Sequence, residues 1–527
     1  CDQPSRLAYF LESKLCHDPR GLKAFLEGLT THIRGDITQA LQPLAAASSR
    51  SNMDDYSLIR TLLQVASIQP VLITMLLEKL PELAQEMDEP EYTSGGGSPM
   101  DLPRTLLQQL RWIDHLVDSG ALTAKLLECL TVLPLPLQRE LISYLPEVVE
   151  DAHQAEVVEG LRELQASEPR LLVCMLDAYS SLSLPPSVLG GITQDVLGQL
   201  DSAEHSVLPV LVRFLIESAT ADNMTEVIDE LRNKLQLSSV ESGATEDEDG
   251  TRIEGQQPQQ DNDSLSSHDA LTLDALRRSL EFRSDVAGSF LKVIAEASRC
   301  TPVDLWVLLS LLVCPATRSK ALALYKRKAG SGQLDEGLLQ DAVNGLAGAL
   351  QGLFPQLLEV AGELVRCSNR KARAHGQALY VCLFKEFKAQ LYHQQEVVAE
   401  LIAHVGGTDS ARNEGGEVTC ALGVLHQLAE EEAAGLRTFD AFLKGMLDYL
   451  HQGLTHAQVR SVFRILCAAL VNIDEVHIFI RKYISHAQLE LKYIGIIGAV
   501  AFAITRGRMT QDEREPEAAA IDASKSA

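Results

Sequence analysis

Apolar residues along the chain recur at the three- to four-residue spacing of amphipathic α-helices. Two of the clearest seams are Leu106-Leu110-Ile113-Val117 and Val157-Val158-Leu161-Leu164. Most of the helices that this spacing predicts are roughly ten to eighteen residues long and end at proline, glycine or serine. No alternating apolar–polar run is long enough for a strand. The pattern therefore predicts an all-α protein without significant β-sheet, an α-solenoid of irregular antiparallel helix pairs of the HEAT or armadillo kind.

A Leu-Pro step recurs at three places in this pattern. The steps are Leu80-Pro81, Leu145-Pro146 and Leu208-Pro209. Proline has no backbone N–H to donate, and the first turn of a helix is where that donor is not needed. We therefore expect each of the three prolines to lie in the first turn of a new helix.

Polar, low-complexity stretches interrupt the helical pattern. The longest, 238–269, is rich in Ser, Gln, Asp, Glu and Gly and contains too little apolar surface to fold by itself. We expect a helical block over 1–237, a disordered acidic and polar linker over 238–269, and a second helical block over 270–505. The sequence beyond Arg506 is charged and alanine-rich, so 506–527 is expected to be a disordered tail.

Composition and charge narrow the class of protein. Hydrophobic residues make up 46% of the 527 residues and aromatic residues only 5%, which suits helix-on-helix packing. The formal net charge of −26 argues against a protein that binds nucleic acid over its whole surface. The ten cysteines include no C-x-x-C pair, and there is no signal peptide or membrane-spanning stretch, so we expect reduced thiols. The chain opens on Cys1 without a methionine and is expected to be a fragment of a longer protein.

The sequence contains none of the common catalytic motifs. Neither H-E-x-x-H nor G-x-S-x-G occurs. The Gly95-Gly96-Gly97 run lacks the lysine and hydroxyl residue of a phosphate-binding loop. His451 and His456 have no companion ligands at metal-binding spacing. The chain is therefore predicted to be a non-enzymatic scaffold or interaction protein, with no metal site and no cofactor.

Basic residues cluster in two islands in the second half of the chain. The islands lie about one HEAT period apart. The first contains Arg318, Lys320, Lys326, Arg327 and Lys328, and the second contains Arg366, Arg370, Lys371 and Arg373. The candidate DNA-backbone contacts among them are Lys326, Arg327, Lys328, Arg370, Lys371 and Arg373. In a solenoid this spacing stacks both islands on one ridge that can contact the backbone of a nucleic-acid duplex. The alternative is that both islands are solvated helix C-termini, where positive charge interacts favourably with the helix dipole. No base-reading motif accompanies either island.

A long apolar stretch near the end of the helical pattern carries a single lysine, Lys492. No residue from Tyr493 to Thr505 is charged, and the run is too short to cross a bilayer. Ser485 and Gln488 have the spacing of a capping box, so we expect a helix to begin there. Lys492 then lies near the start of a helix that is mostly buried.

The helical turn of about 100° per residue divides this helix into two faces. The positions expected on the same face as the lysine are Ser485, Gln488, Gly495, Ile496, Ala499 and Ala503. Those expected to point toward the core are Ile494, Ile497 and Ile504, with Val500 at the edge. Glycine inside a helix costs about 1 kcal/mol relative to alanine, and close approach of a second surface is one reason to keep it. The residues alone leave two interpretations open. Either another helix of the same solenoid packs on this face and the Lys492 side chain only extends to solvent, or Lys492 is a site of chemistry.

Five segments of the chain resemble the Fanconi anaemia group D2 family, in the family's order. They are QLRWIDHLVDSGALTAKLL (Gln109–Leu127), VIDELRNKLQL (Val227–Leu237), QQEVVAELIAHV (Gln394–Val405), KGMLDYL (Lys444–Leu450) and LKYIGIIGAV (Leu491–Val500). The similarity covers most of the chain, from about Tyr56 onward, and the residues before it match only loosely. Members of the family are much longer α-solenoid proteins, so this chain corresponds to their N-terminal part.

The resemblance implies a DNA-repair scaffold of the interstrand cross-link pathway, without catalytic activity of its own. Family members form a heterodimer with the group I paralogue that clamps double-stranded DNA. A ubiquitin ligase with its E2 enzyme attaches a single ubiquitin that locks the clamp, and a deubiquitinase reverses the step. By motif position the ubiquitin acceptor is Lys492. The expected location is the nucleus, on chromatin after DNA damage, with no membrane contact.

The resemblance also gives Lys492 a surrounding surface. We expect Gln488, Gly495, Ile496 and Ala499 to face the paralogue, so that the small residues shield the lysine until DNA binding exposes it. Thr510 precedes a glutamine, as in checkpoint-kinase phosphorylation sites. The alternative function is a HEAT-type adaptor or regulatory scaffold that binds peptide segments of other proteins.

Overall fold

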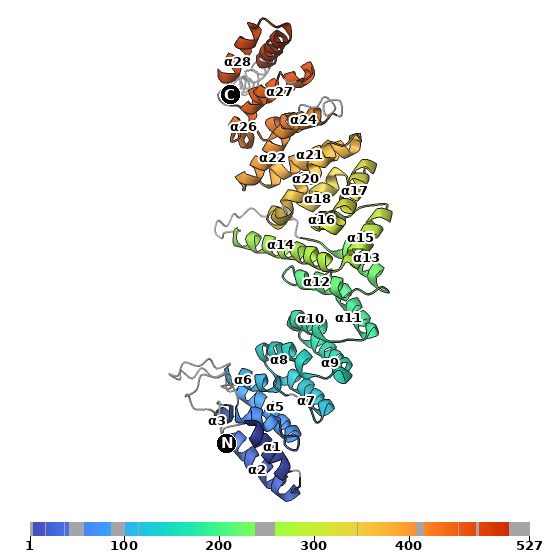
Figure 1. Ribbon diagram of the computed structural model, residues 1–527, viewed down its shortest axis with the longest axis vertical. Helices are drawn as coiled ribbons and strands as arrows, with labels where there is room; N and C mark the ends of the chain where they lie inside the picture. Colours follow the sequence, from blue (N-terminus) through green and yellow to red (C-terminus); the bar gives the residue numbers. More distant parts are fainter. Residues whose placement is uncertain are drawn as a thin grey trace, which may run out of the picture. The chain divides into compact units, whose positions relative to one another are not determined.

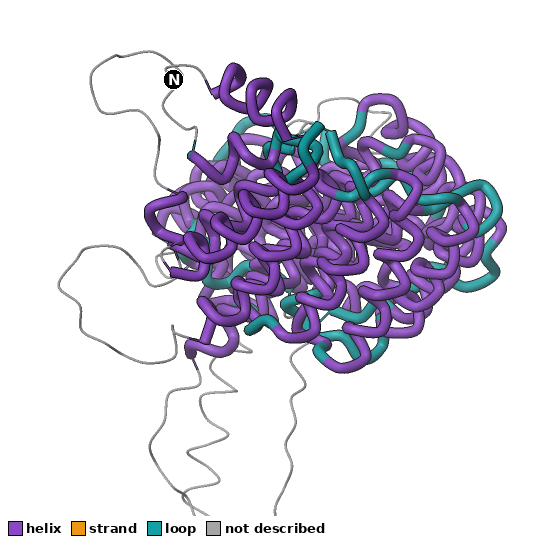
Figure 2. The backbone as a smooth tube through the Cα atoms, turned by 90° about the horizontal axis from the view of Figure 1, so that it is seen from below, coloured by secondary structure: helices purple, strands orange, loops and turns teal. Residues whose placement is uncertain are grey.

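Helices are the only regular elements in the part of the chain that the structure describes, and none of its residues forms a β-strand (Figures 1 and 2). The computed structural model describes residues 4–15, 17–35, 37–41, 57–85, 101–113, 115–237, 259–344, 346–406, 416–451, 453–470 and 474–504. Helices pack side by side with their leucine-rich faces buried, for example α8 (Leu135–Val148) on α10 (Leu172–Ser181) and α20 (Phe354–Val365) on α21 (Arg370–Glu386). The predicted all-α solenoid is confirmed.

Contacts between helices divide the chain into two compact units, Cys1–Val196 and Leu197–Ala527. The helices that begin in the first unit are α1 (Pro4–Leu15), α2 (Pro19–Gly35), α3 (Ile37–Leu41), α4 (Leu58–Leu63), α5 (Gln69–Gln85), α6 (Asp101–Leu110), α7 (Ser119–Val132), α8 (Leu135–Val148), η1 (Asp151–His153), α9 (Gln154–Ser167), η2 (Pro169–Leu171), α10 (Leu172–Ser181) and α11 (Pro186–Gln199).

The second unit contains the basic islands and Lys492. Its helices are α12 (Leu208–Ser218), α13 (Met224–Lys234), α14 (Gln259–Phe282), α15 (Ser284–Glu296), α16 (Pro302–Val313), α17 (Pro315–Ser331), α18 (Glu336–Val343), α19 (Ala347–Leu350), η3 (Gln351–Leu353), α20 (Phe354–Val365), α21 (Arg370–Glu386), α22 (Leu391–Val405), α24 (Glu417–Glu431), α25 (Ala433–Arg437), α26 (Asp440–Gly445), η4 (Met446–Tyr449), α27 (His456–Ala469) and α28 (Asp474–Ile484). A final helix covers 489–504.

The predicted linker does not separate the two units. The boundary lies within α11, and α14 already begins at Gln259, inside the stretch that composition assigned to the linker. Asp269, at the predicted end of the linker, is only 1% exposed, because α14 packs along α12 (Figure 1). Burial of apolar residues such as Leu273 against α12 outweighs the polar composition at the start of α14. The rest of the linker and the predicted tail, with Thr510, lie outside the described residues.

Buried glutamine side chains link several pairs of consecutive helices by hydrogen bonds. Each lies near the start of one helix, and its side-chain nitrogen donates to a carbonyl near the end of the helix before: Gln69 to Leu63 (2.9 Å), Gln138 to Leu130 (2.7 Å) and Gln394 to Phe384 (2.9 Å). The last carbonyls of a helix have no partner within the helix, and leaving one buried without a hydrogen bond costs about 1–3 kcal/mol. These glutamines thus permit short connections between packed helices.

The Leu-Pro steps follow the prediction at one of three places. Pro209 lies in the first turn of α12, but Pro81 lies inside α5 and Pro146 inside α8. A proline inside a helix cannot bond to the carbonyl four residues before it. In α5 that carbonyl, of Leu77, instead accepts a hydrogen bond from the buried Cys129 thiol of α7 at 3.4 Å. A neighbouring helix therefore compensates for the missing donor, which local sequence does not reveal.

Candidate functional site

The helix that carries Lys492 begins four residues later than the predicted capping box. Ser485 Oγ donates to the Arg481 carbonyl and so caps the end of α28. The backbone N–H of Gln488 donates to His486 Nδ1 at 3.1 Å, and the helix starts at Leu489. The predicted capping box is therefore wrong, because the serine completes the preceding helix.

Small residues of this helix face inward. A Cβ added to Gly498 would lie 2.8 Å from the Phe463 ring, and one added to Gly495 only 2.4 Å from the backbone nitrogen of Ile484. Both glycines are buried, as is Ala501. The predicted orientation is therefore only partly correct. Ile494 is buried and Ala503 is exposed as expected, but Gly495, expected beside Lys492, is buried because α28 approaches its backbone closely.

Large apolar side chains of the same helix point outward. We call this surface the outer stripe; its members and exposed fractions are Leu489 (69%), Tyr493 (50%), Ile496 (44%), Val500 (53%) and Ile504 (40%). Their spacing of three or four residues places them on one side of the helix. Val500 and Ile504 were expected near or in the core, and of the isoleucines only Ile494 is fully buried.

Lys492 is exposed at the border of the outer stripe. It lies about 60° around the helix axis from Leu489, and Ile496 follows it one turn later. Two of the four residues expected to face the paralogue, Gln488 and Ile496, are also exposed. The other two do not face outward in the same way, since Gly495 is buried against α28 and Ala499 is half-buried.

The candidate contacts of the first basic island occupy the last turns of α17, and the three side chains have different environments. Lys326 Nζ lies 2.5 Å from Glu363 Oε2 of α20. Lys328 is only 3% exposed, and its Nζ donates to the Ala297 carbonyl at the end of α15 at 2.6 Å. Of the three, only Arg327 is freely exposed. The expectation that Lys328 can contact DNA is therefore not met in this structure, because its amine caps a neighbouring helix.

The candidate contacts of the second basic island lie at the start of α21, not at a helix C-terminus. Asn369 caps the helix, and Arg370 and Lys371 are exposed in its first turn, with Arg373 half-buried behind them. Positive charge at this end of a helix is opposed by the helix dipole. The alternative interpretation of these residues as a C-terminal dipole effect is therefore wrong. Arg370 and Lys371 therefore place exposed positive charge at a helix end whose dipole is already positive, where a bound anion is favourable.

The structure brings the two islands together. Lys371 Nζ donates to the Ser331 carbonyl at 3.4 Å, and Asn369 Nδ2 donates to the Gly330 carbonyl at 3.2 Å, both at the end of α17. The exposed side chains of Arg327, Arg370 and Lys371 therefore belong to one surface, which we call the basic corner.

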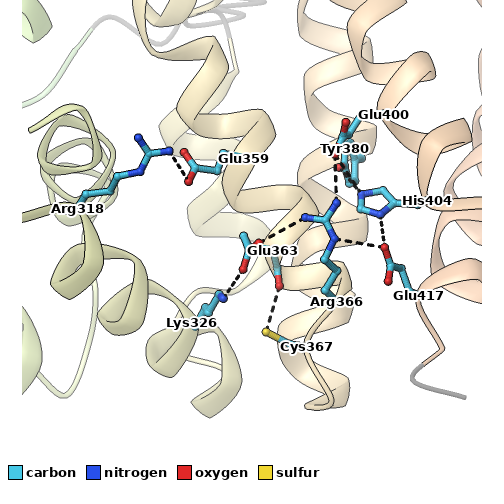
Figure 3. Close-up of polar contacts among 10 residues, drawn as sticks. All are labelled: Arg318, Lys326, Glu359, Glu363, Arg366, Cys367, Tyr380, Glu400, His404 and Glu417. Carbon is cyan, nitrogen blue, oxygen red and sulfur yellow. Dashed lines mark hydrogen bonds and ion pairs between the residues drawn. The ribbon is translucent and has the colours of Figure 1, made fainter. Parts of the chain in front are cut away.

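A partly buried polar network behind the basic corner was not found from sequence; Glu417 and His404 are buried in it, whereas Arg366 is exposed. Arg366, just after α20, donates to Glu363 (3.4 Å), to Glu400 of α22 (3.5 Å) and to Glu417 of α24 (3.3 Å) (Figure 3). Only the Glu363–Arg366 pair has a spacing that sequence can suggest. The other partners are 34 and 51 residues away.

A histidine completes this network. His404 Nδ1 donates to Glu417 Oε1 at 2.6 Å, so its Nε2 can accept from the Tyr380 hydroxyl, 3.1 Å away (Figure 3). Burial raises the pKa of Tyr380, which keeps its hydroxyl protonated as a donor. Helices α20, α21, α22 and α24 are thereby joined through polar side chains.

The described residues offer little for other kinds of site. Among them, no group of three or more His, Cys, Asp or Glu side chains could hold a metal ion. None of the described helices is both long enough and apolar enough to span a membrane.

The fold and these surfaces define the class: an all-α solenoid protein, with an exposed lysine on an apolar helix and a basic corner as its main features. The chain belongs to the Fanconi anaemia group D2 family. The model of the family described as "Fanconi anaemia protein FancD2 nuclease" matches residues 9–527. The word nuclease in that description differs from our expectation of a non-enzymatic protein, which remains a prediction.

Similar proteins from animals cover nearly the whole chain. The Fanconi anemia group D2 protein homologs of Rattus norvegicus and Mus musculus are 30% and 31% identical over 94% of this chain and 35% of their own length. The Fanconi anemia group D2 protein of Gallus gallus is 30% identical over 92% of this chain and 34% of its own. The chain thus spans about a third of these relatives. A solved structure described as "Structure of APUM23-GGAAUUGACGG" matches with a TM-score of 0.21 at 11% identity over 98% of this chain and all of that one, too weakly to support any conclusion.

Proposed function

We propose that this chain is part of a non-enzymatic scaffold of DNA interstrand cross-link repair, with Lys492 as the acceptor of a single ubiquitin. The observation that carries the proposal is the position of Lys492, exposed on a rigid helix at the border of the outer stripe. Family membership supports the repair role. A ubiquitin ligase with its E2 enzyme attaches the ubiquitin, and a deubiquitinase removes it.

The environment of Lys492 suits an acceptor. The amine must reach a thioester carbon on the E2 enzyme, so an exposed lysine on a fixed helix is favourable. The helix is held from beneath by α27 and α28 through Gly495 and Gly498. A lysine near the start of this helix is therefore presented at a defined position.

The outer stripe is the surface that we assign to the group I paralogue. Its five large side chains form a continuous apolar face, as at the centre of a protein–protein interface. Because Lys492 lies at its border, a partner that covers the stripe also limits access to the amine. We propose that DNA binding by the heterodimer shifts this interface and exposes Lys492, and that ubiquitin then locks the clamp.

The basic corner is the surface that we assign to the backbone of double-stranded DNA. Arg327, Arg370 and Lys371 add positive charge where the dipole of α21 is already positive, so phosphate groups would be bound favourably. The net charge of −26 makes such a local surface necessary for DNA contact. A nuclear, chromatin-associated protein follows from this assignment.

Reconstituted ubiquitination of the chain with its paralogue, the ligase, the E2 enzyme and DNA tests the acceptor. Lys492→Arg should abolish the single-ubiquitin band. Lys482→Arg, which changes an exposed lysine at the end of neighbouring α28, should leave the band intact. A single-ubiquitin band that persists in Lys492→Arg would show that the acceptor assignment is wrong.

A further inference from the structure

Two glutamates of α20 hold basic side chains of α17. Glu359 Oε1 lies 2.7 Å from Arg318 Nη2, and Glu363 Oε2 lies 2.5 Å from Lys326 Nζ (Figure 3). Glu363 is also within 3.4 Å of Arg366. The Lys326–Glu363 pair is adjacent in sequence to Arg327 of the basic corner, and the Arg318–Glu359 pair extends the row toward the start of α17.

The two glutamates form a regular row of negative charge. They are four residues apart, so they lie one above the other on the same side of α20, roughly 6 Å apart. The contacts to Lys326 and Arg366 lower the pKa of Glu363, with the Lys326 hydrogen bond as the main cause, so it stays ionised. A row of anions held by lysine and arginine has the same charge pattern as a nucleic-acid backbone on a basic surface.

We propose that Glu359 and Glu363 act as internal substitutes for phosphate groups, which occupy Arg318 and Lys326 and restrain DNA binding at the basic corner. This inference rests on the proposed DNA function of that corner. As long as the two carboxylates occupy Arg318 and Lys326, they lower the affinity of the chain for DNA. When DNA phosphates replace the carboxylates, DNA gains contacts to these two cations.

The pairs are open to such an exchange. The Arg318 and Lys326 side chains are 54% and 32% exposed, and those of Glu359 and Glu363 are 29% and 33% exposed. Ion pairs at such exposed positions contribute little to folding stability. A phosphate can therefore displace either carboxylate at little cost in folding stability.

An alternative role is purely structural, in which the pairs only fasten α17 to α20. The two roles differ in one measurable quantity. If the pairs only fasten the helices, removing the carboxylate charges lowers stability and leaves DNA affinity unchanged. If they stand in for phosphates, the same change increases both affinity and its dependence on salt.

The chain offers a matched control at the opposite end of α21. Glu431 pairs with Lys385 at 2.7 Å, and Glu432 pairs with Lys388 at 2.7 Å. Glu431→Gln/Glu432→Gln removes two negative charges, as Glu359→Gln/Glu363→Gln does, but at a place away from the basic corner. The control therefore separates a local effect from a change in net charge.

The test is the fluorescence anisotropy of a labelled double-stranded oligonucleotide titrated with the chain at several KCl concentrations. Glu359→Gln/Glu363→Gln should bind about five- to twentyfold more tightly at low salt, with the slope of log K against log salt steeper by about one to two. Glu359→Gln alone, which leaves Glu363 and its two cations intact, should steepen the slope by about one. The control pair should change affinity less than about twofold.

Equal gains in the double variant and its control, or no gain in either glutamate variant, would overturn the inference. Arg327→Ala/Arg370→Ala/Lys371→Ala is measured alongside and should weaken binding. If only this triple variant changes affinity, the DNA assignment stands and the phosphate-substitute role fails. If the triple variant binds as wild type does, the DNA assignment itself fails.

Discussion

His404 Nδ1 and Glu417 Oε1 lie 2.6 Å apart, and both residues are almost completely buried. Glu417 is the first residue of α24 and also accepts from Arg366. One carboxylate thus serves two donors from other segments of the second unit. Its loss leaves the buried Nδ1–H of His404 without this acceptor, whereas Arg366 is exposed and keeps Glu363 and Glu400. Leaving a buried polar group unpaired is among the costlier changes in a protein interior.

We therefore expect Glu417→Ala to lower the free energy of unfolding by roughly 2–4 kcal/mol. Glu431→Ala, which removes an exposed glutamate of the same helix, should cost less than about 1 kcal/mol. Urea denaturation followed by circular dichroism measures both. Similar losses for the two variants would mean that the polar network contributes no more than a surface pair.

Stability should also fall with decreasing pH because of His375. This histidine is 5% exposed beside Tyr325 (3.1 Å between Nε2 and Oη), and burial lowers its pKa from 6.5 to about 4. Between these values the unfolded chain binds a proton that the folded chain does not. The stability that the neutral, buried His375 provides is therefore complete above pH 6.5. As the pH falls from 6.5 toward 4, the free energy of unfolding decreases by about 1.4 kcal/mol per pH unit.

Urea denaturation of the wild type and His375→Gln at pH 7.5, 6 and 5 isolates this effect, because other titrating groups are common to both. As the pH falls, the free energy of unfolding should decrease more steeply in the wild type than in the variant. The difference in slope against pH should correspond to the uptake of about one proton on unfolding. Parallel pH curves would contradict the assignment of a buried, neutral His375.

The effect of a glycine-to-alanine substitution on stability should depend on which atoms the new methyl group contacts. Gly495→Ala should be the most damaging, because its Cβ meets backbone atoms of α28 that cannot move aside. Gly498→Ala meets the side chains of Phe463 and Ile480 and should cost less. Gly288→Ala, in the middle of α15 with nothing within 4 Å, should gain about 0.5–1 kcal/mol from helix propensity.

Hydrogen exchange of the 489–504 amides measures how well this helix remains docked. We expect faster exchange in Gly495→Ala than in Gly498→Ala, and no change in Gly288→Ala. If Gly495→Ala exchanged like the wild type, the close contact with α28 would not hold the helix.

The outer stripe should be needed for association but not for folding. Ile496→Lys places a charge in the stripe, where Ile496 is 44% exposed, and should weaken binding to the paralogue at least about tenfold. Ile478→Lys, at a 66% exposed position on neighbouring α28, should have little effect. Calorimetric titration gives both affinities, and thermal denaturation checks that both variants fold. Equal affinities would remove the stripe from the interface.

Much of this organisation could be predicted from sequence. Helical periodicity depends on residues three or four apart, so it revealed the helices, the absence of strands among the described residues, and an apolar helix around Lys492. The islands containing Lys326 and Arg370 were also visible as local clusters of charge. In each case the signal lay within one or two turns of chain.

What failed depended on neighbours distant in sequence. Gly495 and Gly498 predicted a close approach, but the sequence left open whether the approaching surface is a helix of the same solenoid, as found with α27 and α28, or a partner protein. Ser485 was assigned to the start of the last helix, although its hydroxyl caps the end of α28, and Lys328 gave no sign that it would cap α15. Composition likewise assigned Asp269 to a linker, although it is buried in α14.

By itself, then, the sequence determined that the protein is a stack of amphipathic helices, that Lys492 lies near the start of one of them, and that basic residues gather at two places. Only the tertiary structure decided which face of that helix is outside, which basic side chains are exposed, and which are held by Glu359 and Glu363. The difference arises from how far apart in sequence the interacting residues are. Backbone hydrogen bonds and helix periodicity are local, whereas burial and ion pairing depend on helices that the chain brings together from dozens of residues away.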